Sequence, residues 1–159
     1  IALLGLERVW AELGTTDSIV PLVTAALRAR PDDPTLRIVQ LRALGMLHRD
    51  AEARAAYQEW RFAAAGDVTP YREYARFLLE RGRLAAADSV LAQAAGARTR
   101  LGARWRELAL ERAQLRAAVG AWTESATAWR EALAVIPSAE QGAVSTLQGA
   151  PDSSRAAVA

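Results

Sequence analysis

Arginine is the residue type whose spacing in this sequence points most directly to chemistry. Arg8, Arg42 and Arg76 follow one another at a constant interval of 34. A guanidinium group binds a carboxylate through two parallel hydrogen bonds, so a row of arginines suits an acidic peptide. If the chain repeats at this interval, the three side chains form a ladder on successive repeats. Arg72 and Arg106, separated by the same interval, lie one helical turn before this column and widen the row.

The arginine ladder has a second interpretation, in which its members belong to a solvent-exposed face. Arginine is abundant in this chain, so some alignment of arginines is expected by coincidence. Glu7, Glu12 and Glu80 are available as ion-pair partners on such a face. Exposed pairs of this kind contribute little to stability. The sequence leaves both interpretations open.

His48 is the only histidine, and the chain has no cysteine. It falls between two helical stretches, and no cluster of carboxylates near it has the spacing of metal ligands. We therefore expect His48 to be a turn residue. The sequence contains neither a phosphate-binding glycine loop nor the order of residues found in a Ser-His-Asp triad. It predicts no metal site and no cofactor.

Glu107 and Glu111 lie one helical turn apart and are the remaining candidates for an acid and a base. Two carboxylates at this spacing can share a reaction, as they do in glycosidases. Their helix is rich in arginine, which favours ion pairs instead. The nearby cations are Arg104, Arg106 and Arg112. We expect these ion pairs rather than catalysis, and we expect that the chain is not an enzyme.

The elements that must position these residues recur at the same interval. Gly14, His48 and Gly82 each stand between two apolar helical stretches, which predicts the turns of helical hairpins. In the second helix of each hairpin, a small residue is expected where helices cross closely, at Ile19, Ala53, Ala87 and Ser125. A bulky apolar residue follows four positions later, at Val23, Tyr57, Leu91 and Trp129. The next small position holds Ala26, Trp60, Ala94 and Ala132.

This pattern resembles the tetratricopeptide repeat family, in which small, bulky and small residues step through the second helix and a proline closes it. The proline stands at Pro31 and Pro137. The aromatic, Leu and small columns of the family's first helix fall on Tyr71, Tyr74 and Ala75 and on Trp105, Leu108 and Ala109. The second copy departs from the family at Arg37, Gln40 and Trp60.

The resemblance implies an all-α fold, a right-handed superhelical solenoid of about four antiparallel helix hairpins. In the family, the column of Arg8, Arg42 and Arg76 faces a concave groove that holds peptides. In some members, basic residues of this groove clamp the terminal carboxylate of an acidic peptide. The resemblance therefore implies a scaffold that binds a peptide or helix of a partner protein.

The tryptophans fall into two groups. Three occupy repeat positions that are normally packed, and we expect them in the core: Trp10, Trp105 and Trp129. Trp60 replaces a small residue, and Trp122 starts a helix, so either can lie at an interface. With Tyr57 nearby, Trp60 is the expected centre of an apolar patch that faces a partner.

One copy of the repeat is longer than the others. Tyr71 and Trp105 keep the interval of the repeat, whereas Gly82 and Gly120 are separated by four positions more, so the insertion falls between Trp105 and Gly120. Four residues make about one turn of an α-helix. The first helix of the fourth copy, over 100–118, is therefore expected to be one turn longer than its equivalents and to project beyond the stack.

Composition agrees with a single helical repeat domain. Of 159 residues, 52% are apolar, and strand-like alternation is absent. The predicted helices are 1–13, 17–30, 34–47, 50–65, 69–81, 84–95, 100–118, 121–136 and 138–148. They group into a domain over 1–148, with repeats at 1–33, 34–67, 68–99 and 100–137 and a terminal helix at 138–148. The segment 149–159 is expected to be a disordered tail.

Charge and hydropathy limit the kinds of partner. The net charge of +2 is small and argues against a wholly basic protein built for nucleic acid. No apolar run is long enough to span a membrane. The expected partner is a protein or peptide, acidic if the ladder is functional. The alternatives are an accessory subunit packed laterally in a larger complex and a regulatory repeat segment of a multidomain protein.

The basic residues are all arginine, which indicates a GC-rich and bacterial source. The absence of cysteine permits the cytoplasm, the periplasm and the exterior alike. Because an apolar helix opens at Ile1 without a capping residue, we expect the polypeptide to continue upstream.

Overall fold

The computed structural model describes residues 16–154, and no β-strand occurs among them. The all-α class is confirmed. The chain divides into two compact units, residues 1–73 and 74–159, with the boundary inside helix α5 (Thr69–Glu80). The expected helix 1–13, with Arg8 and Trp10, and the turn at Gly14 lie outside the described residues.

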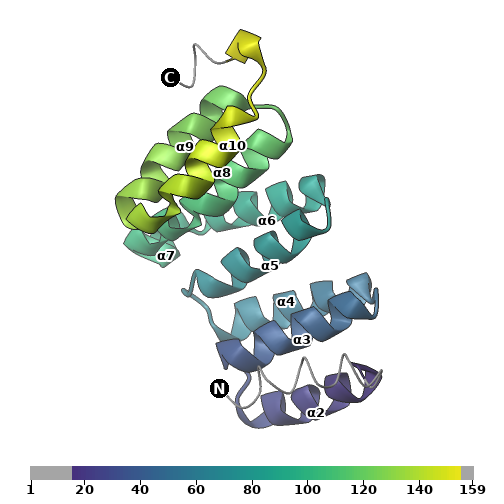
Figure 1. The fold of residues 1–159 in the computed structure, drawn as a ribbon. Coiled ribbons are helices and arrows are strands. Elements are labelled where there is room, and N and C mark those ends of the chain that lie inside the picture. Colours follow the sequence, from purple (N-terminus) through teal and green to yellow (C-terminus); the bar gives the residue numbers. More distant parts are fainter. Residues whose placement is uncertain (1–15, 155–159) are drawn as a thin grey trace. The chain divides into compact units, whose positions relative to one another are not determined.

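The first unit contains helices α2 (Thr16–Ala29), α3 (Pro34–Met46) and α4 (Asp50–Ala63). Helix α3 packs against both α2 and α4 (Figure 1). Its start is capped by Asp33, whose Oδ1 accepts hydrogen bonds from the backbone N–H groups of Thr35 (3.0 Å) and Leu36 (3.1 Å). Pro34 occupies the first turn, where its missing N–H costs nothing.

The second unit continues with α6 (Leu84–Gly96), α7 (Arg98–Leu101), the 3-10 helix η1 (Gly102–Leu108), α8 (Ala109–Ala118) and α9 (Trp122–Val135). A short 3-10 turn η2 (Pro137–Ala139) leads into α10 (Glu140–Gln148). Helices α8, α9 and α10 lie side by side in Figure 1. Trp129 and alanines of all three helices form their shared core, because alanine permits close approach of the backbones. The predicted terminal helix is confirmed.

Three hairpin turns have the same backbone conformation. His48, Gly82 and Gly120 have positive φ angles of 55°, 66° and 77°. In each turn, the N–H of the following residue donates to a carbonyl five positions earlier: Arg49 to Leu44 (2.9 Å), Arg83 to Leu78 (2.9 Å) and Ala121 to Arg116 (2.8 Å). This is the Schellman motif, whose left-handed residue is usually glycine. The predicted turns at His48 and Gly82 are confirmed, and His48 serves as a turn residue.

The repeated columns of the second helices are buried. The first small column is 0–1% exposed throughout, at Ile19, Ala53, Ala87 and Ser125. The bulky column is also buried, at Val23, Tyr57, Leu91 and Trp129. Ser125 is the polar member, and its hydroxyl donates to the carbonyl of Ala113 at 2.9 Å. A buried hydroxyl without such a partner would be costly.

The insertion in the fourth copy does not lengthen an α-helix, so the predicted continuous helix over 100–118 is wrong. Helix α7 ends at Leu101, and Gly102 adopts φ 58° and ψ −141°, which lies outside the α-helical region. The segment from Gly102 to Leu108 then winds as a 3-10 helix with about three residues per turn. Trp105 therefore stands on a 3-10 segment rather than on a regular α-helix.

The end of the described chain is partly packed. Ala150 is buried, and residues 152–154 have helical backbone. The remainder of the expected tail, residues 155–159, lies outside the described residues. Among the described helices, none is both long enough and apolar enough to cross a membrane.

Candidate functional site

A pocket of about 690 Å³ opens in the second unit between α6, η1, α8 and α9. Its apolar lining consists of Leu91, Ala92, Ala95, Trp105, Leu115 and Ala128. Leu91, Leu115 and Ala128 are buried and form the floor. The polar lining consists of Asp88, Arg112, Arg116, Thr123, Glu124, Thr127 and Glu131. The pocket thus combines an apolar floor with a charged rim.

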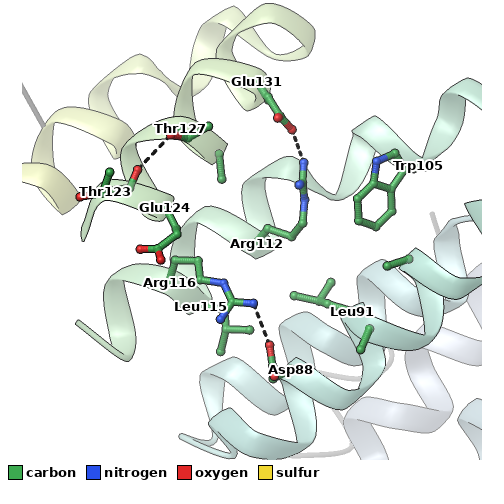
Figure 2. A pocket seen from close by; sticks show the side chains of 13 residues that line it. Asp88, Leu91, Trp105, Arg112, Leu115, Arg116, Thr123, Glu124, Thr127 and Glu131 are labelled. Atoms are coloured by element: carbon green, nitrogen blue, oxygen red, sulfur yellow. Dashed lines mark hydrogen bonds and ion pairs between the residues drawn. The ribbon is translucent and has the colours of Figure 1, made fainter. Parts of the chain in front are cut away.

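Two ion pairs connect the helices around this pocket (Figure 2). Arg112 on α8 donates through Nη2 to Glu131 on α9. Arg116, one turn further along α8, donates through Nη2 to Oδ1 of Asp88 on α6 at 3.1 Å. These side chains are partly exposed, so each pair contributes at most about 1 kcal/mol. Their main effect is to hold the rim side chains in defined positions.

Trp105 lies at the edge of the pocket, and two arginines contact the faces of its ring. The guanidinium carbons of Arg98 and Arg112 lie 4.7 and 4.6 Å from the centroid of its ring. Both distances are within the range of cation–π contacts. Trp105 is half-buried and lines the pocket, so the expectation that it belongs to the core is wrong. Trp129 is buried as expected, and Trp122 is half-buried.

Arg76 of the ladder binds a carboxylate that sequence reasoning did not consider as its partner. Its Nη2 lies 2.8 Å from Oε1 of Glu111, whose side chain is 0% exposed. The expected partner of Glu111 was an arginine of its own helix, but the structure brings Arg76 from α5 to it. Glu107 does pair within its segment, with Arg104 at 3.2 Å. Since Arg76 compensates a buried charge, its charge is already engaged.

The other ladder arginines are distributed over both units. Arg42 is exposed on α3, and Arg72 is half-buried with its Nε 3.2 Å from Oε1 of Glu73. Arg106 is exposed on η1 in the second unit. Arg8 lies outside the described residues. The alignment of these side chains into one row stays a prediction.

Trp60 is 1% exposed and is one of the largest fully buried side chains. A side chain buried to this degree presents no surface to a partner, so the expectation of a partner-facing patch centred on Trp60 is wrong. The neighbouring Tyr57 is buried too, with its ring edge-on to that of Tyr71 at 6.2 Å between centroids. Both aromatic residues belong to the core.

The predicted second repeat copy contains a buried arginine at one of its departures from the repeat pattern. Arg37 is 4% exposed, and its Nε donates to the carbonyl of Pro31 at 2.9 Å. Its Nη1 lies 3.1 Å from Oε1 of Gln40 and 3.2 Å from Oε2 of Glu59. Arg37 and Gln40 thus replace apolar contacts with a hydrogen-bonded network. The two unusual residues, three positions apart, were the signal of this network in the sequence.

Residues 16–154 contain no group of three or more histidine, aspartate or glutamate side chains that could hold a metal ion. Comparisons of the chain with protein-family models, curated proteins and solved structures found no match.

Proposed function

We propose that this chain is a protein-interaction module that binds a peptide or helix of a partner in the pocket of the second unit. The observation that carries the proposal is the pocket itself, which is lined by the buried Leu91 and Leu115, by the half-buried Trp105 and by a rim of charged side chains. Its volume lies in the range of sites that hold compact ligands. Interfaces of proteins likewise combine an apolar centre with a polar rim.

The recurrence of the hairpins supports the same proposal. Three turns share one hydrogen-bonding pattern, and the small and bulky columns recur in the buried cores. We propose that the chain is a scaffold of about four hairpins stacked in a right-handed superhelix, as the resemblance to tetratricopeptide repeats implies. Stacked helical repeats expose extended surfaces that serve mainly to hold other macromolecules.

The pocket is a better candidate for the binding site than the arginine ladder. Arg76 binds the buried Glu111, so carrying its guanidinium to a partner would leave that carboxylate poorly compensated. Binding in the pocket requires no such exchange. Its rim arginines, Arg112 and Arg116, are already held by Glu131 and Asp88. A rim ordered in advance reduces the entropy lost on binding.

The alternative of a laterally packed subunit has less support. It would use the edges of the module, a projecting helical turn and Trp60. Trp60 is buried, and residues 100–118 contain the 3-10 segment η1 rather than one long α-helix. We therefore keep a binding role for the chain, and we propose no catalytic residue.

The proposal is tested by selecting peptides from a random displayed library on the full chain and measuring their affinity by fluorescence anisotropy. Ala92→Arg places a long charged side chain in the pocket, and Ala85→Arg makes the same change on an exposed site of α6 that does not line it. We expect Ala92→Arg to weaken binding at least about tenfold and Ala85→Arg to leave it unchanged. Selected peptides that bind both variants equally well place the site elsewhere, and a selection without binders contradicts peptide binding.

A further inference from the structure

We propose that the basic segment Arg98–Arg106, formed by α7 and most of η1, docks an acidic stretch of the same partner whose apolar side chains enter the pocket. The inference rests on the proposed function and adds the chemistry of the partner. It assigns to the partner a run of carboxylates next to an apolar anchor.

The charge of this segment is the first support. Nine consecutive residues contain four arginines and no acidic residue: Arg98, Arg100, Arg104 and Arg106. All four side chains are exposed. Arg104 pairs with Glu107, and Arg98 lies over the ring of Trp105. Within residues 16–154, Arg100 and Arg106 make no ion pair or side-chain hydrogen bond. Their guanidinium groups are available to carboxylates of a partner.

The second support is that the basic segment and the pocket share a residue. Trp105 belongs to the segment and also lines the pocket, and it contacts Arg98 of the segment and Arg112 of the rim. Trp105 thus joins the basic segment to the pocket. In the proposed complex, the carboxylates of the partner lie over the segment and its apolar side chains lie over Leu91 and Leu115.

The charges of the rim favour an acidic peptide over nucleic acid. Asp88, Glu124 and Glu131 line the pocket with three carboxylates against the two guanidinium groups of Arg112 and Arg116. A nucleic acid carries one phosphate per nucleotide and would meet these carboxylates as soon as it left the basic segment. A peptide changes from acidic to apolar at that point. The small net charge of the whole chain agrees with a local attraction only.

The experiment uses peptides selected by pocket binding, each synthesised with an adjoining run of glutamates or with the same number of glutamines. Anisotropy titrations on the full chain measure both versions. We expect the glutamate version to bind about tenfold more tightly at low salt and to lose this gain as salt is raised. In Arg100→Gln/Arg106→Gln the gain should disappear, while the glutamine version binds as before.

The matched control is Arg28→Gln/Arg54→Gln, which removes the same charge from two exposed arginines of the first unit. It should keep the gain, and far-ultraviolet circular dichroism should show equal helicity in all variants. Equal binding of the two peptide versions, or a gain that survives in Arg100→Gln/Arg106→Gln, overturns the inference while pocket binding stands. Displacement of the acidic peptide by an equal concentration of a single-stranded thymidine oligonucleotide overturns it in favour of nucleic acid. If the selection yields no peptide that binds the chain, both the proposed function and this inference are contradicted.

Discussion

The same position of the predicted repeat has opposite environments in the two units. Arg37 in the first unit and Trp105 in the second stand two intervals of 34 residues apart in the sequence. Arg37 is buried among hydrogen-bond acceptors of its own unit, whereas Trp105 is half-buried at the edge of a pocket. The polar residue is therefore packed inside its unit, whereas the apolar residue is partly exposed to solvent. Hydrophobicity alone therefore does not decide which positions of the predicted repeat are buried and which are partly exposed.

The difference follows from the backbone and from the partners that each side chain meets. Arg37 stands on the regular helix α3, where Gln40 lies one turn away and Glu59 faces it from α4. Trp105 stands on η1, where the tighter winding turns side chains in other directions than an α-helix would. The 3-10 winding of η1 distinguishes this segment from α3, and Trp105 on η1 lines the pocket of the second unit.

The largest effect is expected from Arg37→Ala. The change leaves the amide oxygen of Gln40 buried without this donor, removes the hydrogen bond to the carbonyl of Pro31, and leaves a cavity. We expect a loss of about 2–4 kcal/mol in the free energy of unfolding. Urea unfolding followed by circular dichroism measures it. Arg54→Ala, at an exposed position of α4, should stay within about 0.5 kcal/mol of the parent. Equal losses in the two variants would show that the buried hydrogen bonds of Arg37 do not stabilise the first unit.

Arg76→Met tests the buried charge of the second unit. It removes a donor from Glu111, whose carboxylate is fully buried, and we expect a loss of about 1–3 kcal/mol in stability. The double variant Arg76→Met/Glu111→Met should be more stable than Arg76→Met, because no buried carboxylate remains. The measurement is a double-mutant cycle from urea unfolding. Strictly additive losses would rule out a direct coupling between the two side chains.

Trp105→Ala tests whether the partly exposed Trp105 contributes more to peptide affinity than to the free energy of unfolding. Trp105 contacts solvent and the pocket, so we expect a loss of about 2 kcal/mol in peptide binding, or roughly 30-fold in affinity. Loss of stability should be about 1 kcal/mol, below that of Arg37→Ala. Anisotropy titration and urea unfolding of the same sample give both numbers. A stability loss above that of Arg37→Ala, with unchanged affinity, would assign Trp105 to the core after all.

The smallest effect concerns the hairpin turns, where the first unit has His48 and the second has Gly82 and Gly120. His48 holds a left-handed conformation that costs a side chain about 1 kcal/mol. His48→Gly should therefore stabilise the chain by about 0.5–1 kcal/mol, the gain being reduced by the greater freedom of glycine when unfolded. Gly120→Ala should destabilise it by a similar amount. Thermal unfolding measures the Tm of both variants. We expect His48→Gly to raise the Tm and Gly120→Ala to lower it.

Local features of this protein were predictable from its sequence. The turns at His48 and Gly82 follow from a left-handed residue between helices, and the cap at Asp33 depends on neighbours two and three residues away. The buried columns follow from periodicity. Positions such as Leu91 and Trp129 recur at the spacing that one face of a helix requires.

The candidate site was less predictable. Arg106, predicted to bind a partner, is exposed, whereas Trp60 proved to be buried and Trp105 to be partly exposed. Trp105 lines the pocket from the 3-10 segment that begins at Gly102, whose backbone lies outside the α-helical region. A pattern based on repeat length registers four additional residues but not whether the backbone near them is α-helical or 3-10 helical.

By itself, the sequence determined the all-α class, the hairpin turns and the faces that are buried, because each depends on residues within a few positions of one another. Tertiary structure decided where the charges lie. The acceptors of Arg37 include Glu59, 22 residues away, and Glu111 meets Arg76 across 35 residues. The free energy of a buried charge depends on the groups that surround it in space. For that reason, only the packed helices show which arginines are buried in the fold and which are exposed on its surface.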